Sequence, residues 1–115
     1  MESQVETGIA PRLRDLLMGL PDAALPITYR QAAEALGLSP PRTIQRVAQA
    51  LEALMREDVA ADRPMIAALV VSRRGDLPRQ GFFDLAVALG RFPADPAEHQ
   101  AAYRQELERV MALRT

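Results

Sequence analysis

The chain has 115 residues, with 14 basic and 15 acidic side chains, one histidine, no cysteine and a formal net charge of −1. The lack of cysteine excludes disulfides, thiolate zinc sites and a thiol nucleophile, and a single histidine, His99, excludes a multi-histidine metal cage. Charged residues are scattered through residues 1–20, so we expect no signal peptide and no membrane span, but a cytoplasmic protein. The length fits one domain over residues 1–115, for which we expect no metal and no cofactor.

The first predicted element is a helix over residues 11–20. Apolar side chains recur at helical spacing there, at Ile9, Leu13, Leu16, Leu17 and Leu20. Pro11 is compatible with a first helical turn. Gly19 and Pro21 are expected to end the helix.

Two further helices are predicted over residues 29–36 and 42–56. Thr28 is a suitable N-cap for the first of them, and Gly37 is suited to end it. The second helix follows a turn over residues 39–41, because the two prolines there can begin a helix but cannot continue one. Two short helices joined by a turn predict a helix-turn-helix, the unit that places its second helix in a DNA groove.

The second half of the chain predicts a strand and two helices. Residues 65–71, with the sequence MIAALVV, are short and apolar enough for a buried strand, which we expect to pair with residues near Leu77. Gly75 indicates a turn between them. Helices are predicted over residues 81–89 and 97–113, the last of which carries an apolar stripe.

Three helices followed by a strand and a basic turn are the ingredients of a winged helix. The expected fold class is therefore mainly α with a small β element. We expect a winged helix-turn-helix over residues 11–90 and an added C-terminal helix within residues 96–113.

Several side chains are candidates for contacts with DNA, although the net charge lacks the basic excess of a dedicated nucleic-acid binder. Polar side chains on the third helix lie opposite its apolar stripe and could reach phosphates or base edges, or form an ordinary solvated face. Tyr29 could bind a phosphate through its hydroxyl or pack at the edge of the core. Arg73 and Arg74 could enter a minor groove as a wing does, or remain solvated. The candidate residues are Tyr29, Arg42, Gln45, Arg46, Gln49, Arg73 and Arg74.

Short motifs add a family resemblance over residues 13–89. Thr28-Tyr29 opens a predicted helix, the segment QRVAQAL follows over residues 45–51, and Val70-Val71 precedes Gly75. This order resembles the C-terminal DNA-binding domain of the O6-alkylguanine-DNA alkyltransferases and of the catalytically inactive alkyltransferase-like proteins. The resemblance implies a winged helix and DNA as the ligand. The family arginine that fills the gap left by a flipped base aligns with Gln45, or with Arg46 after a shift of one residue.

The resemblance does not extend to the reactive residues of that family. The Pro-Cys-His-Arg segment before the Val-Val pair corresponds here to residues 66–69, with Ala67 at the position of the nucleophile. Alkyl transfer needs an activated thiolate, so we expect no alkyl transfer and no catalytic residue.

Two functions remain open. The chain is either a non-catalytic winged-helix DNA-binding protein, with duplex DNA as its partner, or a protein interaction or oligomerisation module of a bacterial or phage system. For the second function, the amphipathic C-terminal helix could join a homodimer or bind another protein. Neither function involves a membrane.

Overall fold

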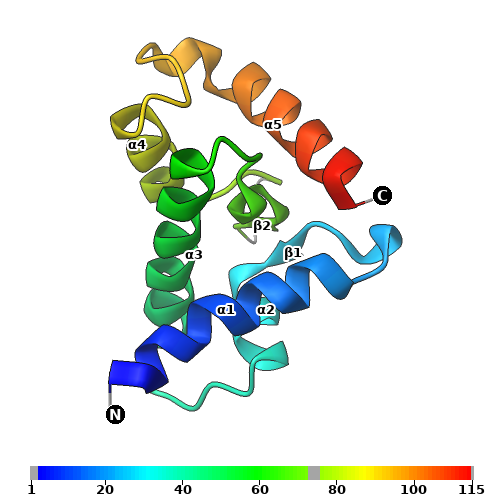
Figure 1. The fold of residues 1–115 in the computed structure, drawn as a ribbon, viewed down its shortest axis with the longest axis vertical. Coiled ribbons are helices and arrows are strands. Elements are labelled where there is room, and N and C mark those ends of the chain that lie inside the picture. Colours follow the sequence, from blue (N-terminus) through cyan, green and yellow to red (C-terminus); the bar gives the residue numbers. More distant parts are fainter. Residues whose placement is uncertain (1–2, 73–75, 115) are drawn as a thin grey trace.

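The computed structural model describes residues 3–72 and 76–114, and this part of the chain is mainly helical with one small sheet (Figure 1). This confirms the expected fold class, which is mainly α with a small β element. The helices and strands are α1 (Ser3–Gly19), β1 (Ile27–Thr28), α2 (Tyr29–Ala35), α3 (Thr43–Ala60), β2 (Val70–Val71), α4 (Gln80–Ala88) and α5 (His99–Arg114). Short 3₁₀ turns precede β1, β2 and α5, at Asp22–Ala24, Ile66–Leu69 and Pro96–Glu98.

The two helices of the predicted helix-turn-helix, α2 and α3, form close to the predicted bounds and pack against each other. At the start of α2, the Thr28 hydroxyl accepts a hydrogen bond from the Gln31 amide, and the Gln31 side chain accepts one from the Thr28 amide, which together form a capping box. The helix ends at Gly37, whose φ of 70° suits glycine. α3 begins one residue after the predicted start and continues four residues beyond the predicted end.

The predicted strand over residues 65–71 is wrong for most of its length. Ile66–Leu69 form a 3₁₀ turn, and only Val70–Val71 form a strand. That strand pairs in parallel with β1, not with residues near Leu77. Among the described residues, the predicted pairing is represented by one hydrogen bond, donated by the Ser72 amide to the Leu77 carbonyl at 2.7 Å. The described residues therefore do not form the expected wing.

Two buried carboxylates explain why Ile66–Leu69 form a 3₁₀ turn. The first two amides of the segment are bound by side chains from other helices: Ile66 donates to Asp58 at 3.0 Å, and Met65 donates to Glu106 at 2.7 Å. Acceptors at the start of a helical turn satisfy amides that would otherwise lack a partner. An apolar run by itself does not distinguish a strand from a helical segment, so these two contacts decide the conformation.

The 3₁₀ turn and β2 lie in the middle of the molecule, between α1, α3 and α5 (Figure 1). Every residue from Met65 to Val71 is buried. The C-terminal helix packs over this segment with its stripe, where Tyr103 and Val110 are buried and the Tyr103 hydroxyl donates to the Ala68 carbonyl at 2.8 Å. α5 is thus part of the same core as the helix-turn-helix.

The other helices keep their predicted positions with shifted ends. α4 begins and ends one residue before the predicted bounds. α1 begins at Ser3 and not near Pro11, which lies inside the helix. A proline removes one backbone hydrogen bond there without ending the helix. Over residues 3–72 and 76–114, no helix combines the length and apolar character needed to cross a membrane.

Candidate nucleic-acid interface

The N-terminal half of α3 forms a polar ridge, which we define by Arg42, Gln45, Arg46 and Gln49. These four side chains, with Pro41, line one shallow hollow of the surface. Arg42, Gln45 and Gln49 are exposed, whereas Arg46 is half-buried and donates to the Ser39 carbonyl at 3.3 Å. The opposite side of α3 is anchored in the core by apolar side chains, Val47, Leu51 and Leu54 among them. The ridge is therefore presented on a rigid element.

Most polar groups of the ridge have no partner among the residues that the structure describes. Across the described ranges, the Arg42 guanidinium and the Gln45 and Gln49 amides make no hydrogen bond or ion pair. Arg42 also adopts a left-handed conformation, with φ of 62°, and its side chain does not cap α3. The start of this helix thus combines one cation with backbone amides that its N-cap side chain does not bind, an arrangement that favours anions.

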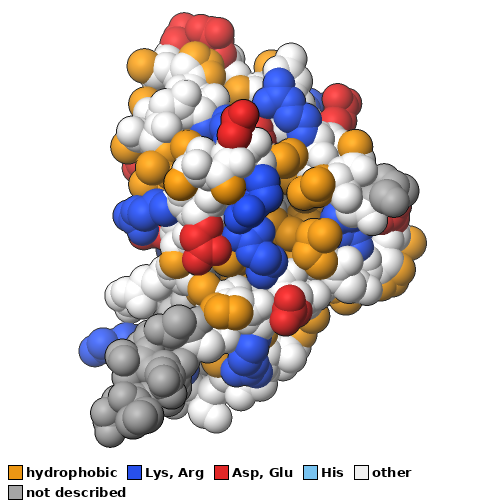
Figure 2. Space-filling view, viewed as in Figure 1, with side chains coloured by type: hydrophobic (Ala, Val, Ile, Leu, Met, Phe, Trp, Pro, Cys, Tyr) orange, Lys and Arg blue, Asp and Glu red, His pale blue; other side chains and the backbone are white. Residues whose placement is uncertain are grey.

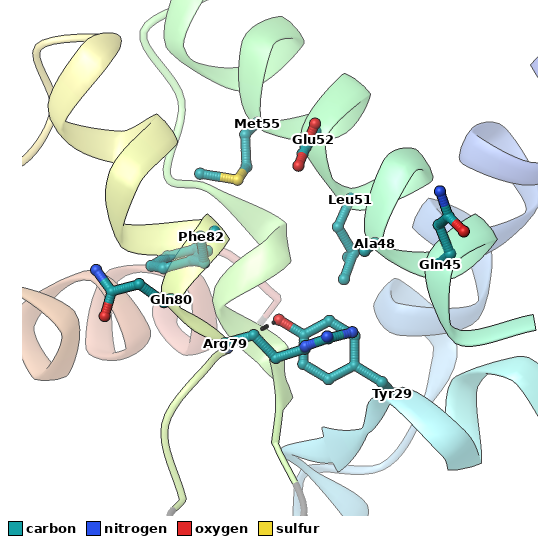
Figure 3. A pocket seen from close by; sticks show the side chains of 10 residues that line it. Tyr29, Gln45, Ala48, Leu51, Glu52, Met55, Arg79, Gln80 and Phe82 are labelled. Atoms are coloured by element: carbon teal, nitrogen blue, oxygen red, sulfur yellow. Dashed lines mark hydrogen bonds between the residues drawn. The ribbon is translucent and has the colours of Figure 1, made fainter. Parts of the chain in front are cut away.

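A pocket of about 500 Å³ lies along one flank of the ridge (Figure 3). Its walls come from α3, through Gln45 and Glu52, from Tyr29, and from the start of α4 with Arg79 and Phe82 (Figure 3). The tertiary structure therefore brings Arg79, the residue before α4, beside α3.

Tyr29 and Arg79 are coupled at the wall of this pocket (Figure 3). The Tyr29 hydroxyl accepts a hydrogen bond from the Arg79 amide at 3.1 Å, and the Arg79 guanidinium carbon lies 5.6 Å from the centre of the Tyr29 ring. Cations in this position are attracted by the ring. Burial raises the pKa of the Tyr29 hydroxyl. Tyr29 thus lies at the edge of the core, as one of its two interpretations expected, and it supports Arg79, which is exposed.

Glu52 limits the surface that can accept an anion. Its carboxylate lies one to two turns beyond Gln45 on the same flank of α3 and lines the pocket with Tyr29 and Arg79. A phosphate that entered this pocket would meet a like charge. The surface without a carboxylate therefore consists of the ridge and the exposed Arg79 side chain.

The other flank of the ridge borders a second hollow, of about 320 Å³, between α1 and α3. Arg46 and Gln49 line it together with Ile9 and Pro11. The ridge is thus bordered by a hollow on each flank.

Charges elsewhere are mixed. On the face shown in Figure 2, acidic and basic side chains are interspersed and do not separate into large areas of one sign. Arg30 is paired with Glu34 at 3.4 Å and Arg14 with Glu57 at 3.1 Å. None of the residues that line the hollow at the ridge is acidic.

The structure brings together four of the seven candidate residues in the ridge and places Tyr29 at the adjacent pocket. Arg73 and Arg74 lie outside the described residues. Sequence reasoning missed Arg79, because its neighbours in sequence do not reveal its approach to α3. Ala67, which the resemblance aligned with the nucleophile of the alkyltransferases, is 1% exposed in the central 3₁₀ turn.

No family model, no curated protein and no solved structure matches this chain.

Proposed function

We propose that this chain is a non-catalytic DNA-binding protein that uses α3 as its recognition helix. The observation that carries the proposal is the ridge, on a helix whose other side is fixed in the core. Arg42, Gln45 and Gln49 are exposed there and have no side-chain partner among the described residues, while Arg46 is half-buried. The major groove of B-DNA is about 12 Å wide and admits an α-helix. Arg42, Arg46 and Arg79 would bind phosphates beside it. A cytoplasmic location belongs to the same proposal.

The alternative function, an interaction or oligomerisation module, has less support. It rested on the amphipathic C-terminal helix, and the buried residues of that helix contact the same chain. Arg114, near its end, donates to the Leu17 carbonyl at 3.0 Å and pairs with Asp22. The stripe that suggested a partner is therefore used within the molecule.

Salt-dependent binding to duplex DNA tests the proposal. Each phosphate contact contributes about 0.9 to the slope of log affinity against log salt concentration. We expect the variant Arg42→Ala/Arg46→Ala to bind more weakly and to lower that slope by about 1.8, if each arginine binds one phosphate. Fluorescence anisotropy with a labelled duplex at several salt concentrations measures both effects.

Arg104→Ala is the matched control. Arg104 is exposed on α5, and no hydrogen bond or ion pair of its side chain is seen in the described part of the chain. This variant should bind as the wild type does. Wild-type protein that shows no salt-dependent binding at low ionic strength, or a double variant that binds as the wild type does, would refute DNA binding by the ridge and favour the interaction module.

A further inference from the structure

The ridge carries two glutamines whose chemistry differs from that of the arginines beside them. Gln45 and Gln49 are four residues apart on α3, and both side chains are exposed. Side chains at this spacing lie on the same side of a helix. A neutral amide adds no charge attraction for phosphates, but it presents a donor and an acceptor side by side. The pair is therefore suited to base edges.

The amides are also available for such contacts. Two other exposed glutamines are bound locally: Gln31 accepts from the Thr28 amide, and Gln80 donates to Asp84 at 3.0 Å. Gln45 and Gln49 make no such bond to any described residue. Arg46 between them is half-buried and held toward the loop by Ser39. The glutamines are thus the free polar groups at the centre of the ridge.

We propose that Gln45 and Gln49 read two adenines through the major groove of a DNA duplex, an inference that rests on the proposed DNA binding. Adenine presents the N7 acceptor and the N6 donor on its major-groove edge, and a glutamine amide can bind both at once. Four residues of an α-helix span about 6 Å, and one base-pair step is about 3.4 Å. With α3 lying along the groove, the two adenines are about two steps apart.

The neighbouring residues define the ends of this reading surface. Arg42 precedes Gln45 at the start of α3 and provides a cation for a phosphate at one end. Glu52 follows one turn after Gln49, and its carboxylate repels a phosphate at the other end. Base contacts by α3 are therefore limited to its first two turns. The contacted sequence should be correspondingly short.

Selection from a pool of duplexes with a randomised centre tests this inference. We compare the wild type with Gln45→Ala, Gln49→Ala and the matched control Gln105→Ala, whose glutamine is exposed on α5. Alanine is the best helix former, so we expect all three variants to keep the wild-type circular dichroism. The wild type and the control should enrich adenine at two positions about two steps apart. Each ridge variant should lose the preference at one of them.

Base analogues in the selected duplex identify the groove. Replacing N7 of the two adenines by carbon removes an acceptor from the major groove, and we expect binding to weaken about tenfold. Replacing the minor-groove acceptor N3 by carbon should leave affinity unchanged. An effect of the N3 change alone, or an unchanged adenine preference in both ridge variants, would overturn the inference.

The two proposals can fail separately. Binding that depends on salt and on Arg42 but has no sequence preference leaves DNA binding intact and refutes adenine reading. Absence of salt-dependent binding to any duplex refutes both proposals.

Discussion

At the scale of single residues, both tyrosines of the chain are held in the core by hydrogen bonds to the backbone of other segments. Tyr29 accepts from the Arg79 amide at 3.1 Å, and Tyr103 donates to the Ala68 carbonyl at 2.8 Å. Burial raises the pKa of both hydroxyls above the ordinary value of 10.0. The chain contains no lysine and no cysteine. The tyrosines are therefore the main side chains that titrate between neutral pH and the arginine range.

We expect the protein to lose stability as pH rises above about 10. Below that pH, the tyrosines are protonated in the folded and the unfolded chain. Above it, the unfolded chain releases protons that the folded chain retains, so the free energy of unfolding decreases. Urea unfolding at increasing pH measures this loss, and Tyr103→Phe should reduce it. Ionisation of both tyrosines of the folded chain at the pH of free tyrosine would contradict the expectation.

Asp58 is a second residue whose role is decided by burial. It is 0% exposed, and its carboxylate accepts from the Ile66 amide at 3.0 Å and pairs with Arg14 and Arg63 at 2.9 and 3.1 Å. Glu57, its neighbour, is exposed and pairs with the same Arg14 at 3.1 Å. The two acids share a partner but differ in solvation.

Asp58→Ala should lower the free energy of unfolding by about 3 kcal/mol, because it leaves the buried Ile66 amide without an acceptor and removes one of the two carboxylates that pair with Arg14. Glu57→Ala should change it by less than about 0.5 kcal/mol, as expected for an exposed pair. Thermal and urea unfolding of both variants provide the comparison. Equal effects of the two substitutions would show that the Asp58 contacts do not stabilise the 3₁₀ turn.

At the scale of elements, the end of α2 depends on one glycine. The Gly37 amide donates to the Glu34 carbonyl and the Leu38 amide to the Ala33 carbonyl, which is a Schellman motif. Gly37 has a φ of 70°, and an added Cβ would meet no atom within 4 Å. The requirement for glycine is therefore one of backbone conformation and not of space.

Gly37→Ala should destabilise the protein by about 1 kcal/mol, because an L residue is strained in this conformation. Gly81→Ala provides the opposite case, since Gly81 lies in α4 without a positive φ and its Cβ would also meet nothing within 4 Å. That variant should be more stable by about 0.5 kcal/mol. Differential scanning calorimetry measures both changes. A change in stability of the same sign in both variants would argue that backbone conformation is not the cause.

At the scale of the whole molecule, the C-terminal helix completes the core and is not an addition to a finished domain. Glu106 of α5 accepts from the Met65 amide and from Arg91, both at 2.7 Å, and Tyr103 binds the Ala68 carbonyl. Arg114 joins the end of α5 to the end of α1. The C-terminal helix, expected within residues 96–113 of a single domain, thus packs into the same core as the preceding helices.

Deletion of residues 96–115 should abolish cooperative unfolding. The shortened chain would expose the central 3₁₀ turn and leave the Met65 amide without its acceptor, in a molecule whose total stability is about 5–15 kcal/mol. Circular dichroism during heating shows whether a sharp transition remains. Arg104→Ala changes the exposed side of the same helix and should retain the wild-type transition. A shortened chain that melts as sharply as the wild type would mean that residues 1–95 form a complete core.

The sequence by itself determined the features that depend on neighbours a few residues apart. Thr28 begins α2 and Gly37 ends it because capping and turn contacts join residues within one helical turn. The spacing of apolar residues likewise located the helices, and the order Arg42, Gln45, Arg46, Gln49 placed them on one helix.

Only the tertiary structure decided the conformation of residues 65–71 and the position of Arg79 beside α3. The sequence does show that Asp58 and Glu106 are acidic residues on apolar stripes. Asp58 follows Leu54 by four residues, and Glu106 follows Tyr103 by three. The sequence does not show which amides these carboxylates bind, because the partners are far apart along the chain: Met65 and Glu106 are separated by 41 residues. A buried carboxylate binds whichever amide the packing brings to it, so the same apolar run became a turn and not a strand.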